Sequence, residues 1–252
     1  MDPVVAALGD QQAELRDLVR SLDDAGWHAS TRCAGWDVAD VVLHLCQTDE
    51  MAIASVKGSY ASMLEGMTAA LDPASSVDSG AAALVEHERG ASNAALLQRW
   101  STGAMTLLEA LEATDMHTRV QWVTGELSAR TLATTRLAET WIHTGDIAGA
   151  LDIELKPTAR LWQIARLAWR TLPYAFASEG RTLAGPVAFR LVGPSGEKWD
   201  LVADEGAATT ISGLATELCD VAARRVDASS TRLRGEGPDA ATVLALVRTY
   251  AS

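Results

Sequence analysis

The sequence predicts an α+β protein in which an N-terminal four-helix bundle is followed by a smaller α+β region. Apolar residues recur at helical spacing in four segments up to Leu151, whereas shorter runs of β type appear after it. Charge changes at the same place, because the chain holds 21 acidic and 9 basic residues up to Leu151 and 12 of each afterwards. We therefore expect two domains, a helical one at 1–153 and an α+β one at 154–252.

The first two helices of the expected bundle come from the N-terminal segment. Apolar residues from Val4 to Leu22 follow a helical period that stops near Asp23. The second helix begins after Asp37, a residue type that caps helices well, and is expected to run to about Met67. Its apolar face carries Val38, Val41, Val42 and Leu45.

The other two helices follow a loop rich in Pro, Ser, Gly and Asp, LDPASSVDSG. The third has a regular apolar stripe that includes Leu96, Trp100 and Leu107. The fourth is capped by Ser128 and ends near Leu151. Helices of this length are typical of an antiparallel-type bundle.

After Leu151 the pattern becomes mixed. Pro157 and Thr158 introduce a helix over TARLWQIARLAWRTLPYAF. The stretch PVAFRLVGPSGEKWDLV has two β-like runs around Gly-Pro-Ser-Gly, which predicts a hairpin. Helical segments from about 213 to 225 and from 239 to 250 follow, with TRLRGEG between them as a candidate strand.

The composition of the chain argues against some classes of binding partner. A net charge of −12 without Lys/Arg clusters repels phosphate backbones and anionic membranes, so we expect no nucleic-acid or membrane partner. The first residues do not form a signal peptide, and no apolar run approaches the ~18 residues that span a bilayer. We therefore expect a soluble, cytoplasmic protein that acts on a small molecule. The oligomeric state is not predicted.

Known nucleotide and hydrolase motifs are missing from the sequence. It contains no GxGxxG, no P-loop and no GxSxG elbow. Its three cysteines, Cys33, Cys46 and Cys219, have neither the number nor the spacing of a disulfide framework or a CxxC metal site. We expect free thiols with structural roles.

The fourth helix carries an unusual charged stripe. Between Thr131 and Asp152 the only ionisable residues are Arg136, Glu139, His143 and Asp146, and all four fall within roughly 80° of helical arc. The rest of that helix is apolar or small, so the stripe is expected to face an interior, where unpaired charges are unfavourable. Something must compensate these charges.

A divalent metal is one way to compensate them. Glu139 and His143 stand four residues apart and lie side by side on a helix, and His44 on the second helix can face them. Two imidazoles and one carboxylate form the ligand set of catalytic zinc, and iron or nickel also suits it. The simpler alternatives are an ordinary ion pair of Glu139 with His143 and a hydrogen-bonded core histidine at 44.

Three other residues have expected roles beside the metal. Asp146 is a candidate catalytic residue, because it can orient a ligand imidazole or hydrogen-bond a metal-bound water. Arg136 can balance carboxylate charge or hold an anionic substrate. Trp36, just before the helix of His44, is a candidate for the mouth of a substrate pocket.

The motifs CAGWDVADVVLHL and RLAETWIHTGDIAGAL, with the spacing between them, resemble the mycothiol-dependent maleylpyruvate isomerases of the DinB-like metal-binding superfamily. That resemblance implies that His44, Glu139 and His143 bind a divalent metal, usually zinc. Segments from about 158 onward, including RTLPYAF and AARRVD, are similar to actinobacterial proteins described only as metal-binding. The likeness covers nearly the whole chain.

The resemblance implies an enzyme with a metal and, as a cofactor, mycothiol. Isomerisation of the maleylpyruvate type would add a thiolate to an activated double bond, allow rotation and eliminate the thiol, whereas a transferase would stop after addition. One alternative is a thiol-independent hydrolase or isomerase that uses a metal-bound water or Lewis acidity. Another is a metal-stabilised binding protein without turnover, in which a fourth protein ligand such as Asp146 closes the site.

Overall fold

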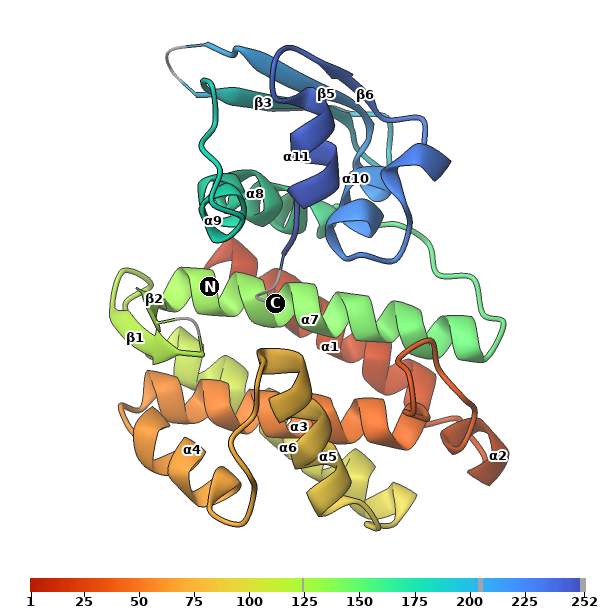
Figure 1. The fold of residues 1–252 in the computed structure, drawn as a ribbon. Helices are drawn as coiled ribbons and strands as arrows, with labels where there is room; N and C mark the ends of the chain where they lie inside the picture. The colour runs from red at the N-terminus through yellow and green to blue at the C-terminus, as the bar shows by residue number, and fades with distance from the viewer. Residues whose placement is uncertain (124, 204–205, 250–252) are drawn as a thin grey trace. The chain divides into compact units, whose positions relative to one another are not determined.

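The computed structural model describes residues 1–123, 125–203 and 206–249, which form two compact units (Figure 1). The first unit comprises Met1–Leu155, and the second begins at Lys156. The described chain is α+β, as the sequence predicts. No helix in the described ranges is both long and apolar enough to cross a membrane.

The first unit is built on four long helices that pack in a ring. In it, α1 packs on α6 and α7, and α3 packs on the same two helices from the other side (Figure 1). The four helices are α1 (Pro3–Val19), α3 (Val38–Val56), α6 (Asn93–Glu112) and α7 (Ala129–Ala150). Three shorter helices connect them: α2 (Asp24–Trp27), α4 (Tyr60–Thr68) and α5 (Val77–Glu88). The predicted four-helix bundle is therefore present.

Local sequence explains where the two central helices begin. The Asp37 carboxylate accepts from the backbone N–H of Asp40, and the Asp40 carboxylate accepts from that of Asp37, which is a complete capping box. Ser128 caps α7 by accepting from the N–H of Thr131. Beyond its cap, α3 buries the predicted apolar face, since Val38, Val41, Val42 and Leu45 are all inaccessible.

Three details of the bundle differ from the prediction. The second helix ends at Val56 instead of near Met67, because Gly58 adopts a left-handed φ of 75° that breaks the helix before α4 starts. Part of the loop predicted after it is helical, since Ser76 caps α5. A short hairpin of β1 (Arg119–Trp122) and β2 (Gly125–Ser128) was not predicted and leads directly into α7.

The second unit is a small α+β structure. Its sheet has the order β4-β3-β5-β6, with β3 and β5 parallel and the outer pairs antiparallel. The strands are β3 (Val187–Val192), β4 (Lys198–Leu201), β5 (Thr209–Leu214) and β6 (Arg234–Glu236). Helices α8, α10 and α11 lie against one face of this sheet (Figure 1).

The elements of this unit follow the predicted pattern with shorter helices. The hairpin around Gly-Pro-Ser-Gly is confirmed as β3 and β4, and TRLRGEG supplies β6. The helices are α8 (Leu161–Arg170), α9 (Leu172–Ser178), α10 (Ala215–Ala222), α11 (Ala240–Leu246) and the 3-10 turn η1 (Ala228–Ser230). Residue 250, the last of the predicted terminal helix, lies outside the described residues.

Asp37→Ala should lower the free energy of unfolding by about 1 kcal/mol, because it removes the side-chain cap of α3. Asp37→Asn keeps a capping oxygen and serves as the control, with a much smaller loss. Urea unfolding of both variants measures the difference. Equal losses for the two variants would show that the lost charge, which pairs with His28, matters more than the cap.

Candidate metal centre

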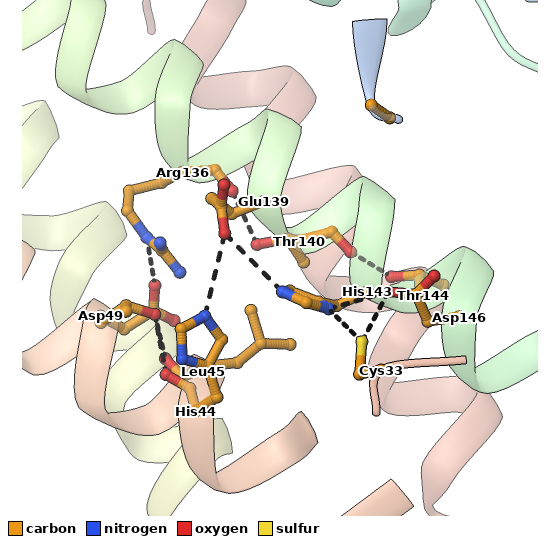
Figure 2. Close-up of polar contacts among 12 residues, drawn as sticks. Cys33, His44, Leu45, Asp49, Arg136, Glu139, Thr140, His143, Thr144 and Asp146 are labelled. Carbon is orange, nitrogen blue, oxygen red and sulfur yellow. Dashed lines mark hydrogen bonds and ion pairs between the residues drawn. The ribbon is translucent and has the colours of Figure 1, made fainter. Parts of the chain in front are cut away.

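The charged stripe of α7 faces the interior of the first unit, toward α3 (Figure 2). Arg136, His143 and Asp146 are buried, and Glu139 is mostly buried. The helix packs on α1 on another side, so its apolar residues are covered as well. The expectation that this stripe points inward is therefore met by the geometry, and its charges have to be compensated within the bundle.

The structure brings His44, Glu139 and His143 together. The Oε2 atom of Glu139 lies 3.8 Å from Nε2 of His44 and 3.7 Å from Nε2 of His143. The two imidazole rings are 5.1 Å apart between centroids and meet edge to face. The three residues each offer one ligand atom, and these atoms all lie within 4.8 Å of one another. Two nitrogens and one oxygen thus converge on one point (Figure 2).

Electrostatics favours an ionised Glu139 and a neutral His44. Burial opposes the charge of Glu139, but the neighbouring imidazole of His44 and the charges of His143 and Arg136 lower the pKa of Glu139 to about 2. Burial lowers the pKa of His44 below its ordinary value, and Arg136 acts in the same sense. A carboxylate and a neutral imidazole are the forms that bind metal.

The ring nitrogen of His143 that faces away from Glu139, Nδ1, contacts Asp146. This Nδ1 lies 3.0 Å from Oδ2 of Asp146, which is almost fully buried. Burial alone would lower the pKa of His143, but hydrogen bonds with Asp146 and Cys33 and the charge of Glu139 raise it to about 9. If Nδ1–H donates to Asp146, the lone pair of a neutral ring is on Nε2, toward Glu139 and His44. Asp146 therefore contacts the nitrogen that faces away from the three-residue cluster.

A buried ion pair links α7 to α3 beside the cluster. Nε of Arg136 donates to Oδ1 of Asp49 over 2.9 Å, and both side chains are 1% exposed. The pair joins the two helices that carry the candidate ligands, since Asp49 follows His44 on α3 and Arg136 precedes Glu139 on α7. Of the two roles expected for Arg136, this contact supports the balance of carboxylate charge. Its expected role in substrate binding stays a prediction.

Trp36 lies next to the cluster. Its ring is 5.1 Å from that of His44, tilted by 43°, and the side chain is half-buried. This position suits a residue that covers one side of His44. Its expected role at a pocket mouth also stays a prediction.

Two residues at this site were not singled out by the sequence. Cys33, expected to be structural, has its Sγ 3.3 Å from Oδ2 of Asp146 and 4.0 Å from Nδ1 of His143. Asp49, the buried partner of Arg136, is not among the predicted site residues. The available signal for Asp49 was its acidic charge five residues after His44 on the same predicted helix, while for Cys33 it was only its place near Trp36 in the CAGWD motif.

The chain has an α+β fold similar to that of the maleylpyruvate isomerases. The chain is similar to a crystal structure of the mycothiol-dependent maleylpyruvate isomerase, with a TM-score of 0.59 and 17% identity over 94% of each chain. A crystal structure of a histidine-to-alanine mutant of that enzyme gives a TM-score of 0.58 and 16% identity over the same shares. At this identity the likeness establishes the fold.

The chain belongs to the family defined by the mycothiol maleylpyruvate isomerase N-terminal domain, whose sequence model matches residues 8–148. This range includes α7 up to Ala148 and all three members of the cluster. Two relatives from Mycobacterium tuberculosis, strains CDC 1551 / Oshkosh and H37Rv, are each 35% identical over 251 residues. The match covers 99% of this chain and 95% of each relative, and both relatives are described as uncharacterized.

Asp49→Leu should lower the free energy of unfolding by about 3 to 5 kcal/mol, because it leaves the buried guanidinium of Arg136 without its carboxylate. The double variant Asp49→Leu/Arg136→Met removes both charges and should recover most of that loss. Urea unfolding of the single and double variants gives both values. A single variant that loses less than about 1 kcal/mol would contradict the importance of this pair.

In protein prepared without metal, stability should fall as the pH rises from 6.5 to about 9. The folded-state pKa of His143 is raised from 6.5 to about 9, so its contribution is complete below pH 6.5 and is lost through that window. The loss is at most roughly 3 kcal/mol. Denaturant unfolding at pH 6 and pH 9 measures it, with the non-titrating His143→Gln as control. An equal loss in the variant would assign the effect to other groups.

Proposed function

We propose that this chain is a divalent-metal-dependent enzyme that uses mycothiol in an isomerase or S-transferase reaction on a small organic substrate. The convergence of His44, Glu139 and His143 from two helices carries the proposal, because three donors of this kind meet within 4.8 Å. Membership of the mycothiol maleylpyruvate isomerase N-terminal domain family supports the thiol. The solved neighbours with this fold are structures of a mycothiol-dependent isomerase.

The donor set fits a divalent cation. Two imidazole nitrogens and one carboxylate oxygen suit zinc, and iron or nickel binds similar sets. Glu139 faces both imidazoles at nearly equal distances, 3.8 and 3.7 Å, as a ligand shared around one centre would. A cation there would offset the buried negative charge of Glu139. The arrangement is thus compatible with metal without a change of fold.

The surrounding residues prepare these donors for binding. Asp146 holds Nδ1 of His143, which fixes the ring and directs Nε2 to the centre. Burial lowers the pKa of His44, and the neighbouring His44 and His143, with a further contribution from Arg136, lower the pKa of Glu139, so both groups favour their metal-binding forms. Because the pKa of His143 is raised to about 9, binding at neutral pH displaces a proton from this ring.

The ligand count favours catalysis over a structural role. Structural zinc is enclosed by four protein ligands, whereas catalytic zinc has three and one open position. Asp146 is the candidate for a fourth ligand that would close the site. It contacts Nδ1 of His143, whereas Nε2 of the same ring faces Glu139. A bound divalent cation would supply Lewis acidity, which lowers the pKa of a thiol or water that reaches it.

Purified protein should contain about one divalent cation per chain, and His44→Ala or His143→Ala, each made together with Cys33→Ser so that the thiol beside His143 cannot hold metal, should lose most of it. His117→Ala, at an exposed histidine of the same unit, serves as control and should retain the metal. Metal analysis by plasma mass spectrometry measures all four proteins. Full metal content in either cluster variant would refute the assignment of these ligands.

Mycothiol should change the visible spectrum of the cobalt-substituted protein, because sulfur entering the coordination sphere adds a charge-transfer band. An alcohol analogue that lacks the thiol is the control and should leave the spectrum unchanged. A spectrum that no thiol alters would contradict the thiol-dependent function. That outcome would favour the alternative in which a metal-bound water or Lewis acidity performs the chemistry.

A further inference from the structure

A second group of metal-binding side chains lies on the far side of the His143 ring. Cys33 Sγ, His143 Nδ1 and Asp146 Oδ2 form a triangle with sides of 3.3 Å from sulfur to oxygen, 3.0 Å from nitrogen to oxygen and 4.0 Å from sulfur to nitrogen. The three donors come from different parts of the chain, since Cys33 precedes α3 while the other two lie on α7 (Figure 2). Their ligand atoms all lie within 4.8 Å of one another.

We propose that Cys33, His143 Nδ1 and Asp146 Oδ2 form a binding site for a thiophilic divalent cation such as Zn²⁺ or Cd²⁺, distinct from the His44–Glu139–His143 centre. The site joins one soft sulfur to one nitrogen and one oxygen. A thiolate ligand selects zinc or cadmium over magnesium or calcium, which prefer oxygen alone. The proposal does not require that the first centre bind metal, although the two share one residue.

The spacing of the donors suits tetrahedral coordination. With bonds of about 2.0 to 2.3 Å, ligand atoms around a tetrahedral zinc stand about 3.3 to 3.6 Å apart. The observed separations of 3.0, 3.3 and 4.0 Å lie within about half an ångström of that range. A rotation of the half-buried Cys33 side chain changes the two distances to sulfur, whereas the 3.0 Å separation of Nδ1 and Oδ2 has to open by a few tenths of an ångström.

Charge and hydrogen bonding favour a cation at the same point. Oδ2 of Asp146 accepts from the thiol of Cys33 and pairs with Nδ1 of His143, so two protons can be directed at one oxygen. The other oxygen, Oδ1, faces the half-exposed Arg32, with 3.9 Å between it and Nε of Arg32. A divalent cation takes the place of the protons on sulfur and Nδ1, and together with a thiolate and a carboxylate it forms a neutral group.

The shared histidine makes the two sites compete. A neutral imidazole has one lone pair, so a cation at Nδ1 requires the ring proton to be on Nε2, the nitrogen that faces Glu139 and His44. A cation at Nε2 requires the reverse, with Nδ1–H donated to Asp146. Filling the cysteine site therefore removes a ligand from the first centre.

Cadmium titration followed by ultraviolet absorption tests this site, because a cadmium–thiolate bond gives a charge-transfer band that imidazole and carboxylate ligands do not. The wild-type protein should show one such bond per chain. Cys33→Ala and Cys33→Ser should both abolish the band, and His44→Ala should retain it. The other two thiols, Cys46 and Cys219, are inaccessible in the core and should not contribute.

The outcomes separate this site from the first centre. Absence of the band in the wild-type protein, its persistence in both Cys33 variants, or its loss in His44→Ala would overturn the proposal. Asp146→Asn should weaken cadmium binding at least tenfold. If the double variant His44→Ala/Cys33→Ser keeps its zinc while the cadmium band of the wild-type protein depends on Cys33, the proposed function fails and the cysteine site stands.

Discussion

The pairing of α3 with α7 is the contact on which the site depends. It places His44 opposite Glu139 and His143 and holds three charged or titratable groups where water has little access to them. The Arg136–Asp49 ion pair bridges the same two helices within a few residues of the cluster. Because a buried pair is destabilising when one partner is lost, it also fixes which residues of the two helices face each other.

The charges around this contact are arranged in sequence along α7. Arg136 lies at one end and lowers the pKa of Glu139, and Asp146 lies at the other and raises that of His143. The result is an ionised carboxylate between two imidazoles, of which that of His143 is also held by Asp146. The sequence predicted this order of charges, since spacings of three and four residues put the four charged side chains on one helical face.

The sequence predicted the long helices and the ligands that they carry, and missed features whose signal was weak or lay in an irregular segment. Helical periodicity and the Ser128 cap located α7 and its stripe, and the spacing from His44 suggested the cluster. The role of Cys33 could not be predicted, because its contact with Asp146 joins residues 113 positions apart through an irregular segment. The break of α3 near Gly58 was missed because apolar periodicity continues across the glycine into α4.

The central claim is that two imidazoles and a glutamate hold one cation between α3 and α7. X-ray absorption at the zinc edge of the protein as purified tests it most directly, since the outer-shell scattering of imidazole rings reveals how many are bound. The account predicts a first shell of nitrogen and oxygen with two imidazoles at full occupancy. A first shell without a pair of imidazoles, or a protein that holds no metal after gentle purification, would contradict it.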